Sequence, residues 1–118
     1  MKVEQYIDEG RKLDLVLTFR HPDVSGWLTF IREAIHRYGS LLAPLQITEE
    51  ANLTTVPIVD GCIPHVREAL VQSVIAAKEE VCRAGLGVQV GFNAVPTFDP
   101  ADDFWPSIIT ILGFTIRR

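Results

Sequence analysis

The sequence predicts an α+β fold of the ferredoxin-like kind, with strand, helix, strand, strand, helix and strand in a split βαβ order. Two observations carry this prediction: several short segments alternate apolar and polar residues, and two segments between them repeat apolar residues at helical spacing. Both helices would pack on one face of a mainly antiparallel sheet, and one additional strand would follow at the C-terminal end. With 118 residues the chain has room for one core, so we treat residues 1–118 as a single domain.

The first third of the chain predicts one strand and one helix. Over residues 12–20, leucines and a phenylalanine alternate with polar residues, which is typical of a half-buried strand. Asp23 or Ser25 can cap a helix that continues to Tyr38, and Gly39 can end it. Residues 3–11 fit either a short helix or an edge strand, and the sequence alone does not decide between them.

The middle of the chain predicts two short strands and a long helix. Residues 41–48 and 53–59 are rich in β-branched side chains and flank a polar turn. Pro44 and Pro57 would place at least one of these strands at a sheet edge, because proline cannot donate to a ladder. A helix is expected over about 63–84.

Two further strands are expected after this helix. Residues 86–94 alternate apolar residues with small or polar ones. Residues 108–116 are apolar on both faces of a strand, so this last strand would need a cover on each side.

Charge and hydropathy exclude several classes of partner. The chain carries 15 acidic and 11 basic residues, a net charge of -4, so phosphate backbones and anionic membranes would be repelled. The longest uncharged stretches have 13 residues, short of the roughly 20 that span a membrane. Acidic residues near the N-terminus do not fit a signal peptide. We therefore expect no nucleic-acid or membrane partner and a cytoplasmic location.

The apolar content predicts self-association. Hydrophobic residues make up 47% of the chain, and the long predicted helix carries a second apolar stripe that includes Val71 and Ile75. Ile109 and Ile111 form the second apolar face of the last predicted strand. We expect these four residues to lie in the interface of a homo-oligomer, such as a dimer.

A cysteine and a histidine near the start of the long helix form the first candidate site. Cys62 would lie in the positive field of the helix N-terminus, with His65 able to accept its proton and Asp60 beside it. These three residues are therefore candidates for nucleophilic catalysis. In the alternative interpretation, Asp60 caps the helix, Cys62 is a small buried side chain and His65 is a surface residue.

A loop rich in aromatic and acidic residues forms the second candidate site. Large aromatic side chains beside acids suit the anchoring of a ligand or partner. The spacing of the acids lacks the ligand pattern of a calcium loop, and the chain shows no metal-ligand or cofactor motif, so we expect no metal and no cofactor. The candidate binding residues are Phe98, Asp102, Asp103, Phe104 and Trp105.

Two functions follow from these observations. We expect a homo-oligomeric binding protein for a small apolar ligand or a protein partner, because no catalytic signature is present. The alternative is a small oligomeric enzyme of the isomerase or lyase type, with an interfacial active site built from Cys62 and His65 or from the acids of residues 99–103.

Overall fold

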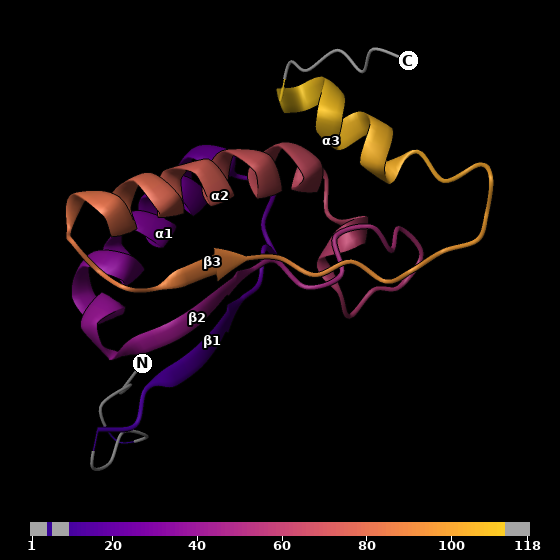
Figure 1. The fold of residues 1–118 in the computed structure, drawn as a ribbon. Helices are drawn as coiled ribbons and strands as arrows, with labels where there is room; N and C mark the ends of the chain where they lie inside the picture. Colours follow the sequence, from indigo (N-terminus) through magenta and orange to yellow (C-terminus); the bar gives the residue numbers. More distant parts are fainter. Residues whose placement is uncertain (1–4, 6–9, 113–118) are drawn as a thin grey trace, which may run out of the picture.

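The protein is an α/β structure in which strands alternate with helices (Figure 1). The computed structural model describes residue 5 and residues 10–112. Its strands are β1 (Leu13–Leu17), β2 (Leu42–Ile47) and β3 (Gln89–Gly91). Its helices are α1 (Val24–Tyr38), α2 (Val66–Arg83) and α3 (Phe104–Leu112), with short 3-10 helices η2 (Gly39–Leu41) and η3 (Asp60–Cys62).

The described strands form one sheet in the order β1-β2-β3, and both neighbouring pairs are parallel. The predicted ferredoxin-like, mainly antiparallel sheet is therefore wrong. Helices α1 and α2 connect successive strands and lie on the same face of the sheet (Figure 1). Two helices were expected on one face of the sheet, and α1 and α2 do lie on one face.

The segment 53–59 explains the change of topology. It was expected to be a strand, but it forms turns and leads into η3. Without a strand here, β2 cannot return through a hairpin, and the chain reaches β3 by crossing over through α2. A crossover of this kind produces a parallel pair, whereas a tight turn produces an antiparallel one.

The C-terminal part of the described chain is a helix, so the strand predicted over 108–116 is wrong for residues 108–112. The Asp103 carbonyl accepts the first helical hydrogen bond of α3 from the Ser107 backbone amide at 2.9 Å. Phe104 and Ile108 are buried, four residues apart on one side of the helix. Residues 113–116, like most of the undecided segment 3–11, lie outside the described residues.

The other predicted elements are present with shorter bounds. Asp23 caps α1, its carboxylate accepting from the Gly26 amide at 3.0 Å. Pro44 lies in the central strand, so it does not mark a sheet edge as expected. Between the pairs Leu13–Leu42 and Leu15–Leu45, two residues of β2, Ala43 and Pro44, lie opposite the single residue Asp14 of β1. Proline is tolerated at such bulges because no ladder hydrogen bond is lost there.

The hydrophobic core fills the space between the sheet and its two covering helices. Ile31 and Ile35 of α1 and Leu70 of α2 meet Leu45 of β2 among fully buried side chains. The opposite face of the sheet carries a mixture of polar and apolar residues, including Gln46, Gln89 and the 42% exposed Val16. The described helices include none long and apolar enough to cross a membrane.

Gly61 provides a test of the packing between η3 and the preceding loop. A methyl group at this buried position would overlap the backbone carbonyl of Leu53, which cannot move aside like a flexible side chain. Gly61→Ala should therefore lower the free energy of unfolding by about 1–3 kcal/mol, measured by urea denaturation. Gly87→Ala is the control, because a methyl group there meets nothing within 4 Å. Equal urea midpoints for the two variants would contradict the packing.

Candidate functional site

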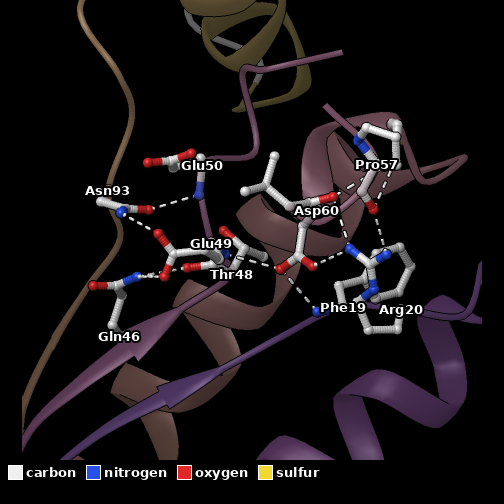
Figure 2. Close-up of polar contacts among 11 residues, drawn as sticks. Phe19, Arg20, Gln46, Thr48, Glu49, Glu50, Pro57, Asp60 and Asn93 are labelled. Carbon is white, nitrogen blue, oxygen red and sulfur yellow. Dashed lines mark hydrogen bonds and ion pairs between the residues drawn. The ribbon is translucent and has the colours of Figure 1, made fainter. Parts of the chain in front are cut away.

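The carboxyl ends of β1, β2 and β3 meet at one edge of the sheet, and polar residues follow each strand there. Arg20 follows β1, Glu49 and Glu50 follow β2, and Asn93 follows β3 (Figure 2). In parallel sheets, ligands bind outside the carboxyl ends of the strands, where loops from several strands converge. This edge is therefore the candidate functional site.

The carboxylate of Asp60 ties the ends of β1 and β2 together. The side chain is fully buried, and its Oδ2 accepts hydrogen bonds from the backbone amides of Phe19 and Glu49, both at 2.9 Å (Figure 2). The Asp60 amide donates to the Glu49 carbonyl at 2.9 Å. Asp60 and Glu49 thus hold each other through two hydrogen bonds, and the position of Glu49 depends on Asp60.

Arg20 supplies the charge that accompanies this buried carboxylate. Its Nη1 lies 3.4 Å from Asp60 Oδ1. The guanidinium also donates to the carbonyls of Val59 and Pro57, both at 2.7 Å. These carbonyls belong to the segment 53–59, which was expected to be a strand. In place of the backbone hydrogen bonds of a neighbouring strand, they accept hydrogen bonds from the Arg20 side chain.

Glu49 lies between two side-chain amides. Asn93 Nδ2 donates to its Oε1 at 2.9 Å, and Gln46 Nε2 donates to its Oε2 at 3.2 Å (Figure 2). Asn93 Oδ1 accepts from the Glu50 amide at 2.8 Å, which fixes the orientation of the Asn93 side chain. A carboxylate oxygen can accept more than one hydrogen bond, so Glu49 keeps capacity for a ligand.

The backbone on both sides of Glu49 is in the left-handed region. Thr48 has φ 64° and Glu50 has φ 47°, a conformation that is costly for residues with a β-carbon. The Thr48 hydroxyl is buried and has no hydrogen-bond partner among the described residues. Such strain persists where the surrounding structure imposes it, and it concentrates at functional sites.

A depression of about 370 Å³ lies over the uncovered face of the sheet, and Glu49 itself is not among its lining residues. Gln46 lines it and also donates to Glu49, so Gln46 connects the depression with the Glu49 carboxylate. Phe92 contributes an aromatic wall, and Asp14 and Gln89 contribute polar groups. Within the described part of the chain, no basic side chain lines this depression.

The predicted catalytic residues do not form the expected group. Cys62 belongs to η3, whereas α2 starts at Val66 with His65 as its N-cap, so the helix begins three residues later than expected and Cys62 lies four residues before it. The Cys62 thiol points toward the Val59 carbonyl at 3.6 Å. Asp60 does belong to the candidate site, but as a buried acceptor of backbone hydrogen bonds. Cys62 and Cys82 are both free and exposed.

The predicted binding residues at the C-terminal end are spread over a loop and α3. Phe98 is almost fully exposed, at 99%, whereas Phe104 is buried in the core. Trp105 is half exposed and packs against Phe92, with ring centroids 5.9 Å apart. Phe104 and Trp105, expected in the loop, are the first residues of α3.

The acids near α3 serve local structure. Asp102 Oδ1 accepts from the Phe104 amide at 3.0 Å, and Asp103 pairs with Arg67 at 2.9 Å. The hydrogen bond from Arg67, together with the guanidinium charge, lowers the pKa of the Asp103 carboxyl below its ordinary value. No cluster of three or more potential metal ligands occurs among the described residues.

The four predicted interface residues are in different environments. Val71 is 7% exposed and belongs to the hydrophobic core, so it is unavailable to a partner. Ile75 on α2 and Ile111 on α3 are exposed, and Ile109 is partly buried. Self-association through the exposed isoleucines remains a prediction.

Sequence reasoning missed Glu49, Gln46 and Asn93, the side chains that converge at the candidate site. Glu49 was assigned to a polar turn between two antiparallel strands. A partial signal was present, since Glu49 directly follows the strand-like segment 41–48, whereas Asn93 was included in the expected strand 86–94. That signal points to a common site only when the strands are parallel and end at the same edge.

No known protein family, curated protein or solved structure matches the chain.

Asp60 allows the connection between β1 and β2 to be tested. Asp60→Ala removes Oδ2, the acceptor that the Phe19 and Glu49 backbone amides share, together with the partner of Arg20. Buried donors then lose their acceptor, so the free energy of unfolding should fall by at least about 1–3 kcal/mol, measured by urea denaturation. Asp14→Ala on the exposed side of β1 is the matched control. A loss no larger than that of the control would show that Asp60 does not tie the strands together.

The pair between Arg67 and Asp103 predicts a pH dependence. Because the pKa of Asp103 in the folded chain lies below 3.8, its contribution to stability is present above that pH and lost as the pH falls through the folded value. An NMR titration of the Asp103 carboxyl should give a midpoint below 3.8. Arg67→Gln should raise this midpoint, and an unchanged midpoint would exclude the pair as its cause.

Proposed function

We propose that the protein binds a small, neutral, hydroxyl-bearing molecule at the carboxyl edge of its parallel sheet, with Glu49 as the central contact. The observation that carries this proposal is the Glu49 carboxylate held between Gln46 and Asn93, of which Gln46 also lines the depression of about 370 Å³. Sites of β/α proteins generally lie at this edge because side chains from separate strands converge there.

The chemistry of the lining favours a hydroxyl-bearing ligand. A hydroxyl group donates to a carboxylate and accepts from an amide, and Glu49, Gln46 and Gln89 offer both kinds of partner. The described lining of the depression holds no basic group to compensate an anion. Phe92 is 36% exposed and offers an apolar surface against which the carbon atoms of such a ligand can pack.

A large apolar partner fits this face less well. Docking an apolar surface over Asp14, Gln46 and Gln89 would remove water from these polar groups without replacing their hydrogen bonds. A small polar molecule can itself form hydrogen bonds with these groups and so replace those that they made with water. The proposal therefore retains the binding function expected from the sequence and changes the ligand at this face from apolar to polar.

A second candidate function is enzymatic, with Glu49 as the group that accepts or donates a proton. The backbone strain at Thr48 and Glu50, directly before and after Glu49, favours it, because strained residues cluster where a reacting group must be held in one geometry. This proposal moves the active site from Cys62, His65 and residues 99–103 to the carboxyl edge of the sheet.

Glu49→Gln tests the binding function. The substitution keeps the size of the side chain but removes the negative charge and one acceptor, so affinity for a bound hydroxyl compound should fall at least about tenfold, the equivalent of one charged hydrogen bond. Neutral monosaccharides and cyclic polyols would be screened by ligand-observed NMR, and any binder measured by calorimetry. Glu68→Gln, on the exposed surface of α2, is the control.

Two results would contradict the proposal. One is a folded wild-type chain that binds no member of the panel, and the other is a binder whose affinity is the same for Glu49→Gln and Glu68→Gln. NMR spectra of the bound compounds followed over time separate the two candidate functions. Chemical conversion that Glu49→Gln abolishes supports the enzymatic candidate, whereas an unchanged compound supports binding alone.

A further inference from the structure

β1 is an outer strand of the sheet, and one of its edges has no partner strand among the described residues (Figure 1). The sheet order is β1-β2-β3, so β1 pairs with β2 alone. A free strand edge presents unpaired backbone N–H and C=O groups, to which a further strand can bind. This edge is therefore a surface on which the sheet can be extended.

The backbone groups on the free edge belong to alternate residues of β1. The Leu17 carbonyl accepts a hydrogen bond from the Thr48 amide at 2.9 Å, so the backbone of Leu17 faces β2. Successive residues of a strand direct their backbone groups to opposite edges. Asp14 and Val16, and Lys12 directly before β1, thus direct their N–H and C=O groups away from β2.

The side chains on the two faces of β1 differ in character. Leu13 and Leu15 pack against the core but are only partly buried, whereas Leu17 is 6% exposed. At the alternate positions, Lys12 and Asp14 are exposed. A strand added at this edge would cover the remaining surface of the two leucines on one face and would meet a pair of opposite charges on the other.

These charges are complementary to those of a second copy of β1. If two β1 strands pair antiparallel around a two-fold axis at Leu13, Lys12 of each copy lies opposite Asp14 of the other, and opposite charges in this position stabilise a strand pair. Both residues direct their backbone groups to the shared edge, so each such pair also exchanges two backbone hydrogen bonds. On the other face, the Leu13 side chains of the two copies meet.

Charge also selects this register over its neighbour. An axis at Asp14 would place the two Asp14 carboxylates directly opposite each other, which destabilises a strand pair. Side-chain alternation excludes a shift of one strand by a single residue, because the leucines would then leave the apolar face.

We propose that the chain forms a two-fold dimer through β1, in which the two sheets join into one and Lys12 of each copy pairs with Asp14 of the other. One short strand from each copy makes a small interface, so the dimer exchanges with the monomer. The interface differs from the one expected at Ile75 and Ile111. It is independent of the Glu49 site, which lies at the opposite end of the strands.

Charge reversal tests both the dimer and its register. Analytical ultracentrifugation of the wild-type chain should show a dimer whose fraction rises with concentration. Asp14→Lys places lysines opposite each other, so the dissociation constant should rise by about tenfold or more, whereas Glu79→Lys on the exposed surface of α2 makes the same charge change and should leave it unaltered. The double variant Lys12→Asp/Asp14→Lys exchanges the two charges and should restore the wild-type dissociation constant.

Three results would overturn the proposal. A wild-type chain that stays monomeric at about 1 mM has no dimer of useful affinity. A dimer that tolerates Asp14→Lys as well as Glu79→Lys forms through another surface. A double variant that dimerises no better than Asp14→Lys excludes the pairing of Lys12 with Asp14.

Amide hydrogen exchange on the unaltered chain covers the case in which a variant does not fold. The Lys12 and Asp14 amides should exchange more slowly as the concentration rises, because each donates to a carbonyl of the second copy in the dimer. Protection that is already complete in dilute solution would show that a segment of the same chain covers the edge, and this would refute the dimer. Amides that stay unprotected while the dimer forms would refute it as well.

Discussion

The buried carboxylate of Asp60 is the interaction on which the rest of this structure depends. It accepts hydrogen bonds from the backbone amides of Phe19 and Glu49. One side chain from η3 therefore connects the segments that follow the carboxyl ends of β1 and β2. Removing a carboxylate from water is costly unless hydrogen bonds and an opposite charge compensate it. Here the two amides and Arg20 provide that compensation, and Arg20 in turn holds the carbonyls of the loop that leads to η3.

This arrangement decides where polar chemistry can occur. Because α1 and α2 cover one face of the sheet, most apolar residues of the strands face the helices, and Asp14, Gln46 and Gln89 line the other face. Asp60 then places the backbone of Glu49 at the end of β2, where Asn93 reaches its side chain from the segment after β3. The candidate site is thus a consequence of parallel strands that end together.

Local signals predicted the elements whose apolar period was regular and whose ends were capped. Strand β1, helix α1 with its Asp23 cap, strand β2 and the central part of α2 were recognisable from alternation, helical spacing and capping residues. The segment 53–59 and residues 108–112 were misassigned because β-branched residues favour strands only where a neighbouring strand offers ladder partners. The first finds the Arg20 side chain instead, and the second packs Phe104 and Ile108 into the core as a helix.

The amino-acid sequence by itself determined that the chain has room for one core, its charge balance, and the approximate positions of most of the helices and strands. The tertiary structure alone decided that the strands run parallel, which residues follow each strand at the shared edge, and that Glu49 lies between Gln46 and Asn93. The physical reason is that periodicity reports which face of an element is buried, whereas strand direction depends on contacts between residues distant in the chain. Asp60 with Phe19, 41 positions apart, is one such contact.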